Sequence, residues 1–221
     1  DRTAAAAAKA FYDEKRGVFV DGVLDGERLA QVSQQTNTWC LWAGLCPRPR
    51  RRAVLERILR DADRTMARSG PYFWSYMLPI LAAEGMHREA LEHIRRLWGP
   101  MLDAGATTLW ETFAGDEKDT WCHPWSAAPV EFLLSDVAGL APLALRGPRG
   151  VLRPRPDLLA RADARLMLPR GAVEIGWERA STGRAELRGR LPEGLEAEVL
   201  DPAGRVVGTV RDRWALAVDL A

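Results

Sequence analysis

A loop-rich stretch, residues 105–126, holds the side chains best suited to chemistry. It contains a glutamate next to a tryptophan, two further tryptophans, and a histidine followed by a proline. A tryptophan ring can stack on the C–H face of a sugar, while a carboxylate beside it binds a hydroxyl group or activates a water. The residues concerned are Trp110, Glu111, Trp121, His123 and Trp125. Their types and spacing are typical of a carbohydrate site on a loop.

The same residues also have structural interpretations. Thr108 and Glu111 have the spacing of a capping box, in which the glutamate binds back to the first amide of a helix. Spacing alone favours this capping role over catalysis. His123 fits a structural histidine as well as a ligand contact. Each tryptophan, taken singly, fits a hydrophobic core, so a catalytic Glu111 is one hypothesis among several.

Polar residues elsewhere are expected to serve the fold. Gln34 and Asn37 lie in an otherwise apolar helical segment, where buried hydrogen bonds are the usual role of such side chains. Asp116, Glu117 and Asp119 fit a solvated loop.

Helices are predicted over the first two thirds of the chain. Residues 51–68, for example, carry apolar side chains at the three- and four-residue spacing of one helix face. Pro71 suits the first turn of a helix, and Gly99-Pro100 is expected to end one. The predicted helices cover residues 3–12, 29–45, 51–68, 71–85, 90–98 and 126–137.

After about residue 150 the hydrophobic pattern changes. Residues 173–177 alternate apolar side chains with others, which is typical of half-buried strands. A segment rich in glycine, proline and arginine, residues 147–156, separates the two patterns. We therefore predict an α+β chain with a helical domain over residues 1–147 and a small antiparallel β domain over residues 148–221.

Composition narrows the classes of function. Hydrophobic residues make up 47% of the chain and charged residues 28%, so the chain can form a core and is not disordered. The formal charge of +1 gives no electrostatic footprint for nucleic acid. No apolar run approaches the roughly 20 residues that cross a bilayer, and the N-terminal residues show no signal peptide. We expect a soluble protein, cytoplasmic or secreted, without a nucleic-acid or membrane partner.

Cysteines and histidines give no metal or disulfide pattern. The three cysteines, an odd number, argue against a disulfide framework. Cys40 and Cys46 lack the spacing of a zinc knuckle. His87 and His93 are six positions apart, so they leave a helix in different directions. We therefore expect no metal and no organic cofactor.

Several segments together resemble the bacterial α-L-rhamnosidase family. They occur in the family's order and cover most of the chain, although no single one is specific. The matching segments are residues 33–37, residues 70–73 with Tyr76, residues 105–113, residues 122–127, and residues 168–171 with the following residues 173–177.

The resemblance implies a fold, an activity and site residues. Members of this family contain an (α/α)6 toroid of six helical hairpins and a small C-terminal β-sandwich, and they cleave terminal α-L-rhamnosides with inversion. Glu111 matches the family's general base, and His123 matches a histidine that contacts the sugar. Trp110, Trp125 and Tyr72 are expected to line the sugar subsite.

The chain carries helices for about half of such a toroid. The family's general acid lies in an earlier motif, and no segment here resembles it. We therefore expect little activity from the isolated chain. We also expect association with an upstream portion of the parent protein or with a second copy, because half a toroid exposes apolar helix faces. The alternatives are a non-catalytic carbohydrate-binding or interaction module, and a hydrolase of the same fold acting on another sugar.

Overall fold

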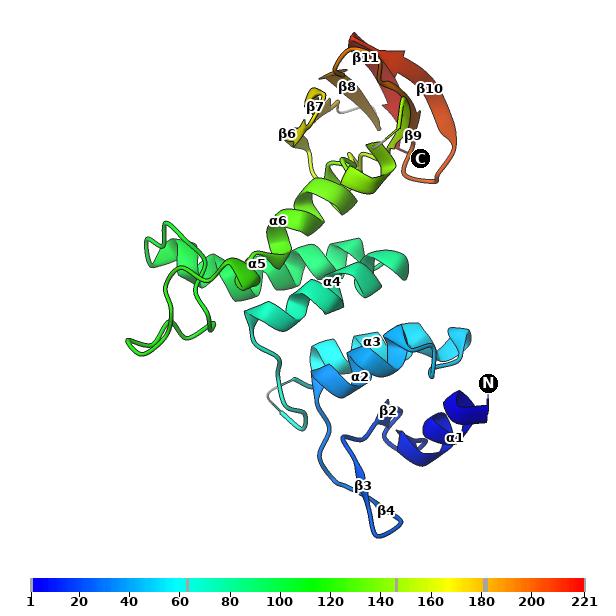
Figure 1. The fold of residues 1–221 in the computed structure, drawn as a ribbon, viewed down its shortest axis with the longest axis vertical. Helices are drawn as coiled ribbons and strands as arrows, with labels where there is room; N and C mark the ends of the chain where they lie inside the picture. Colours follow the sequence, from blue (N-terminus) through cyan, green and yellow to red (C-terminus); the bar gives the residue numbers. More distant parts are fainter. Residues whose placement is uncertain (1, 63, 146, 181–182, 221) are drawn as a thin grey trace. The chain divides into compact units, whose positions relative to one another are not determined.

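The computed structural model describes residues 2–62, 64–145, 147–180 and 183–220. Its internal contacts divide the chain into two units, Asp1–Ala128 and Pro129–Ala221. In Figure 1 the first unit runs from blue to green and is mainly helical, while the second ends in the yellow-to-red strands. The order of helices first and strands second agrees with the sequence-based prediction.

In the helical unit, helices pack on the next helix in the sequence or on the next but one. Helix α2 packs on α3 and α4, and α4 packs on α5, as expected for successive helical hairpins. The elements are α1 (Arg2–Phe11), strands β1 (Tyr12–Asp13), β2 (Val18–Phe19), β3 (Val23–Leu24) and β4 (Glu27–Arg28), helices α2 (Gln34–Trp42) and α3 (Arg48–Arg60), the 3-10 turn η1 (Pro71–Phe73), helices α4 (Trp74–Ala83) and α5 (His87–Asp103), and the 3-10 turn η2 (Pro124–Ser126).

Helix α2 begins at Gln34, so the predicted start near residue 29 is wrong. Ser33 is the N-cap, and its hydroxyl accepts a hydrogen bond from the Thr36 amide at 3.1 Å. The Asp21 carboxylate accepts hydrogen bonds from the amide and the hydroxyl of Ser33, at 2.9 and 2.8 Å. This contact with a residue twelve positions earlier fixes the cap and keeps the preceding residues extended.

Helices α3 and α5 also end at positions other than those predicted. Helix α3 ends at Arg60 instead of continuing to residue 68, because Ala67 exchanges backbone hydrogen bonds with the Val32 carbonyl and the Gln34 amide. Helix α5 continues through Gly99 and Pro100 to Asp103. Pro100 costs the helix one N–H donor and crowds the carbonyl four residues earlier, and burial of Met101 in the next position favours the extra turn.

Two buried amide side chains join separate segments of the helical unit, as predicted. Asn37 is fully buried, and its side chain binds the Phe19 amide at 2.8 Å and the carbonyls of Phe19 and Ser33 at 2.9 Å. Gln34 donates to the Ile58 carbonyl and accepts from the amide and hydroxyl of Ser69, all at 2.9 Å. These bonds hold β2, α2 and α3 together.

The second unit begins with short helices and continues as two sheets. One sheet has the strand order β10-β9-β5, and the other has the order β11-β8-β7-β6. The elements are α6 (Ala128–Phe132), which starts at the end of the first unit, the π-helix η3 (Leu133–Val137), the 3-10 helix η4 (Pro142–Leu145), and strands β5 (Arg149–Leu152), β6 (Arg161–Leu168), β7 (Gly171–Arg179), β8 (Arg184–Arg190), β9 (Glu196–Leu200), β10 (Val206–Arg211) and β11 (Arg213–Asp219).

In β7 the alternating apolar side chains are buried, as the sequence pattern predicts. Val173, Ile175 and Trp177 are buried, and the Trp177 indole donates a hydrogen bond to the Leu159 carbonyl at 3.0 Å. Trp214 and Leu216 in β11 are half-buried. The predicted antiparallel pairing holds in the four-stranded sheet and for β9 with β10, whereas β5 pairs with β9 in parallel. A parallel pair needs a long crossover, which the intervening strands β6 to β8 provide.

Candidate functional site

The loop after α5 is closed by backbone hydrogen bonds between its two arms. The Glu111 amide donates to the Thr120 carbonyl at 2.9 Å, and the His123 amide donates to the Leu109 carbonyl at 2.8 Å. Gly105, with φ of 81°, ends the helix and turns the chain into the first arm. The pairing brings Glu111 and His123 close together although they are twelve positions apart in the sequence.

Glu111 is exposed, and its carboxylate accepts a hydrogen bond from the Thr120 amide at 3.1 Å. Hydrogen bonds from Thr120, together with the nearby charge of His123, hold the pKa of Glu111 below its ordinary value. No helix begins here in the described residues, and the Thr108 hydroxyl donates to the Trp121 carbonyl. The capping-box interpretation of Thr108 and Glu111 is therefore wrong.

A group of exposed and half-buried aromatic rings lies next to His123. We call Trp39, Tyr72, Phe73, Tyr76 and Trp125 the aromatic face. The centroids of His123 and Trp125 lie 6.1 Å apart, and those of Trp125 and Tyr72 lie 5.1 Å apart. Trp125 is 65% exposed. Rings open to solvent in this way can stack on a flat apolar ligand face.

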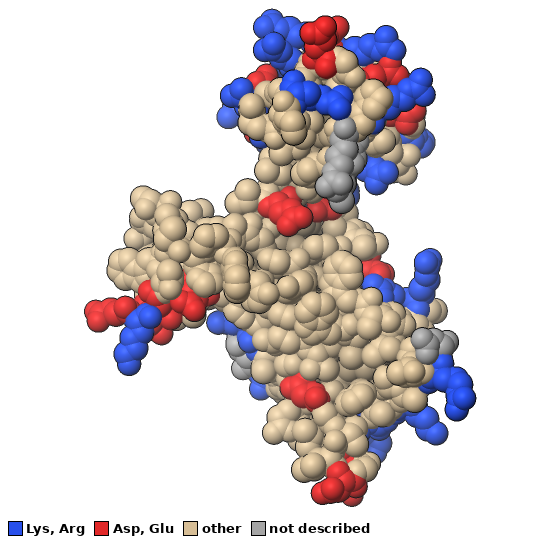
Figure 2. All heavy atoms as spheres, viewed as in Figure 1, with Lys and Arg blue, Asp and Glu red and all other residues tan. Residues whose placement is uncertain are grey.

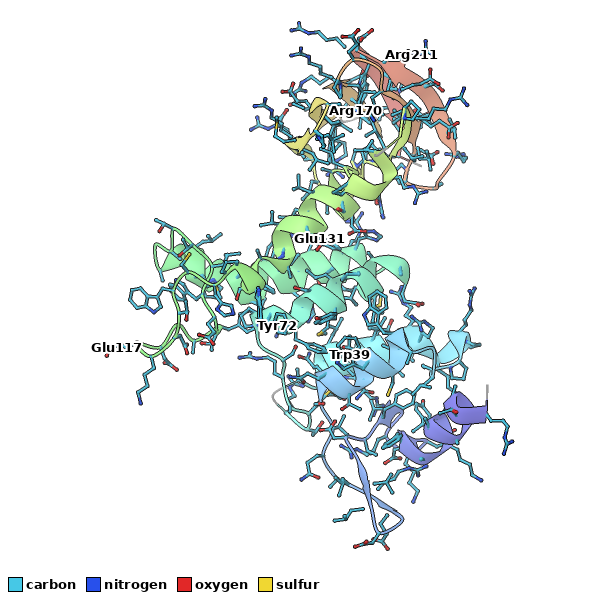
Figure 3. All side chains as sticks on the ribbon, viewed as in Figure 1. Trp39, Tyr72, Glu117, Glu131, Arg170 and Arg211 are labelled. Atoms are coloured by element: carbon cyan, nitrogen blue, oxygen red, sulfur yellow. The ribbon has the colours of Figure 1, made fainter. Side chains whose placement is uncertain are left out.

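The aromatic face is assembled from four elements. Trp39 belongs to α2, and its ring lies 4.7 Å from that of Tyr76 in α4. Tyr72 lies in η1, and its hydroxyl is 3.0 Å from the Tyr76 hydroxyl. Trp39 and Tyr72 are labelled in Figure 3. Sequence analysis did not select Trp39 or Tyr76 as site residues. The i and i+4 spacing of Tyr72 and Tyr76 is the sequence signal that could have found Tyr76, whereas Trp39 joins the group only through the packing of α2 on α4.

Trp110 lies within the loop and is half-buried. Its ring centroid is 6.2 Å from that of Trp121, and its six-membered ring lies against Gly115. Gly115 has φ of 66°, and a Cβ atom there would be 2.3 Å from Trp110 Cε3. Packing of this tryptophan on a glycine therefore sets the shape of the loop that carries Glu111.

Replacing Gly115 by alanine should displace the Trp110 ring and lower the near-ultraviolet circular dichroism of the tryptophans, because a Cβ has no room. Gly26→Ala is the matched control, since Gly26 also has positive φ, 82°, but a Cβ there would meet nothing within 4 Å. The control should lose about 1–2 kcal/mol of stability from backbone strain alone and keep its spectrum. Equal spectra for the two variants would contradict this account of the loop.

Comparison with known proteins identifies the family. The model of the bacterial α-L-rhamnosidase six-hairpin glycosidase domain matches residues 1–137, and that of the bacterial α-L-rhamnosidase C-terminal domain matches residues 149–213. The chain belongs to the bacterial α-L-rhamnosidase family. The resemblance seen in the sequence is thereby confirmed.

Relatives of this rhamnosidase-family chain are much longer than it is. The α-L-rhamnosidase of Streptomyces avermitilis is 28% identical over 199 residues, which is 83% of this chain and 19% of that protein. The crystal structure of a GH78 family rhamnosidase of Bacillus sp. GL1 matches with a TM-score of 0.77 and 29% identity, over 91% of this chain and 22% of that one. The chain thus spans about a fifth of the length of these relatives.

A further structure shows the fold alone. The α-L-rhamnosidase from Dictyoglumus thermophilum matches with a TM-score of 0.65 at 23% identity, over 90% of this chain and 22% of that one. With the family matches, these similarities confirm the predicted fold class, part of a six-hairpin helical domain followed by a small β domain. The two family models leave residues 138–148 unmatched, and the predicted boundary at 147 stays a prediction.

The described residues give few other signs of function. None of the helices that they form is both long and apolar enough for a bilayer. Those same residues contain no group of three or more His, Cys, Asp or Glu that could hold a metal ion. The cysteines are free thiols, with Cys40 and Cys46 buried and Cys122 exposed.

Proposed function

We propose that this chain is the C-terminal part of an inverting α-L-rhamnosidase and that Glu111 is its general base. The observation that carries the proposal is an exposed carboxylate held by Thr120 next to His123 and the aromatic face. A general base must be ionised to take a proton from water, and the lowered pKa of Glu111 favours the ionised form. The bond from the Thr120 amide also fixes the direction in which the carboxylate points.

The sugar would lie against the rings beside this carboxylate. Trp125 and Tyr72 are exposed, with centroids 5.1 Å apart, and offer flat surfaces for the C–H face of a rhamnoside. His123 lies between Glu111 and Trp125, where its ring nitrogens can bind a sugar hydroxyl. Trp110 contributes through the loop that it packs, and we retain it as a subsite residue.

The isolated chain should hydrolyse 4-nitrophenyl α-L-rhamnoside at a rate close to the uncatalysed one. Inversion needs a second carboxyl group, roughly 6.5–9.5 Å from the base, to protonate the leaving oxygen. No segment of this sequence resembles the motif that supplies this acid in the family. Release of nitrophenol by the purified chain is the measurement, with the complete parent protein as the positive control. A rate for the chain equal to that of the parent would overturn the proposal that the general acid lies outside this chain.

The helical unit should associate with the upstream portion of the parent protein or with a second copy. Large apolar side chains are exposed on it, including Leu24, Trp42 and Leu102 besides the aromatic face. Monomers rarely expose contiguous apolar patches beyond several hundred Å². Light scattering on the purified chain should give more than the monomer mass, or a shift in mass when the upstream portion is added. A monomer in both cases would contradict this expectation.

A second candidate function is a non-catalytic carbohydrate-binding module. The exposure of the aromatic face favours it, since stacking rings alone suffice to hold a sugar. Rhamnose binding by the chain and by the parent protein, with no hydrolysis by either, would select this candidate. Hydrolysis of another glycoside by the parent would instead keep the mechanism and change the substrate.

A further inference from the structure

The four-stranded sheet of the second unit carries an open hollow of about 550 Å³ that the proposed reaction does not use. Basic and acidic side chains interleave over the surface of this unit (Figure 2). The charged residues that line the hollow are Asp163, Arg165, Glu174, Arg188, Arg190 and Arg213. The four arginines outnumber the two acids, so the hollow has an excess of positive charge.

Strand register places these side chains on one face of the sheet. Arg188 in β8 lies opposite Gly176 in β7, which lies opposite Asp163 in β6. Two residues further along β8, Arg190 lies opposite Glu174 in β7 and opposite Arg213 in β11. Residues directly opposite each other point to the same face, so the six groups form a single charged surface.

A glycine lets an ion pair cross the sheet. Arg188 Nη2 lies 2.7 Å from Asp163 Oδ1, although β7 runs between their strands. A Cβ atom on Gly176 would be 2.3 Å from that oxygen and 3.3 Å from that nitrogen. The absence of a side chain at Gly176 therefore gives the ion pair its path and leaves a depression beside it.

Arg190 and Arg213 have a different environment. They face each other across neighbouring strands, an arrangement of like charges that costs stability. Glu174, the acid opposite Arg190, is 3.4 Å from Arg165 Nε. Within the part of the chain that the structure describes, neither Arg190 nor Arg213 forms an ion pair. Two exposed arginines at directly opposite positions, both lining one hollow, are suited to bind an incoming anion.

We propose that this hollow binds the carboxylate of an acidic saccharide, an inference that rests on the proposed function in carbohydrate hydrolysis. Arg190 and Arg213 supply planar donors that match a carboxylate. The pairs Arg188–Asp163 and Arg165–Glu174 present donors and acceptors together, as sugar hydroxyls require. The same acids disfavour a compact, doubly charged phosphate. The volume suits a small ligand, since such pockets measure about 300–1,000 Å³.

Calorimetric titration of the whole chain with a trimer of galacturonic acid tests the proposal. The trimer should bind about tenfold or more tightly than its carboxyl-reduced, neutral counterpart, and added salt should weaken it. The double variant Arg190→Gln/Arg213→Gln should lose about tenfold or more in affinity. Arg149→Gln/Arg179→Gln removes two exposed arginines of the same unit that do not line the hollow, and it should bind as the unmodified chain does.

Three results would overturn the proposal. These are equal affinity of the two double variants, equal binding of acidic and neutral trimers, and displacement of the trimer by inorganic phosphate at comparable concentration. Circular dichroism of both variants separates lost binding from lost folding. A Glu111→Gln variant should still bind the trimer, so failure of the proposed catalytic role and failure of this site give different results.

Discussion

Replacing Glu111 by glutamine in the complete protein should lower kcat for rhamnoside hydrolysis by about 10²–10⁴-fold, the usual contribution of a general base. Glutamine keeps the size of the side chain and can still accept the hydrogen bond from the Thr120 amide, but it cannot take a proton from water. KM should change little, because the aromatic face that would hold the sugar remains. Steady-state kinetics on an aryl rhamnoside measure both constants.

The acid limb of the pH profile adds a second readout. A base is active only when it is deprotonated, so the rate should fall as the pH drops through the pKa of Glu111. That pKa lies below the ordinary value for glutamate, so the fall should come at correspondingly lower pH. The glutamine variant should lose this limb. Glu117→Gln is the control, because Glu117 is an exposed acid of the same loop, labelled in Figure 3. Near-full activity of the Glu111 variant would leave Glu111 with a structural role only.

Replacing Asn37 by alanine should destabilise the helical unit by about 3–5 kcal/mol. The change removes three hydrogen bonds and leaves the buried amide and carbonyl of Phe19 without their partner, at about 1–3 kcal/mol for each unsatisfied group. The midpoint of urea unfolding, followed by far-ultraviolet circular dichroism, measures the loss. Gln31→Ala removes an exposed amide side chain just before α2 and should change the free energy of unfolding by less than about 0.5 kcal/mol. A similarly small loss for Asn37→Ala would show that the network contributes little.

Patterns within single elements allowed much of the fold to be predicted. The apolar stripe that α3 buries and the alternation of Ile175 and Trp177 in β7 depend on neighbours in sequence, so periodicity reveals them. The ends of elements depend on distant partners. Asp21 fixes the start of α2, and Val32 and Gln34 bind the segment that follows α3, and no local pattern contains that information.

The candidate site likewise has a part that local sequence predicts and a part that depends on distant contacts. The residue types in the loop and their family resemblance pointed to Glu111 and His123, whereas local spacing favoured a helix cap. The pairing of the loop's two arms decides against the cap, and it joins Glu111 to Thr120, nine positions on, and Leu109 to His123, fourteen positions on. The aromatic face was harder to predict because it combines α2, η1, α4 and η2. Trp39 joins Tyr76 through the packing of α2 on α4, which is long-range in sequence.

Glu111 lies in the loop between α5 and η2, and this position has a consequence for how the sequences of such proteins diverge. The helices need only maintain their packing, and a chain 29% identical to the Bacillus sp. GL1 protein superposes on it with a TM-score of 0.77. Residues 106–123 lie outside the helices, and Phe113 anchors them on Trp98 of α5, with ring centroids 5.0 Å apart, so the exposed remainder of the loop can vary more freely than the helices. New preferences for a glycoside would thus evolve through the exposed residues of this loop together with the rings of the aromatic face, while the buried contacts between the helices are kept.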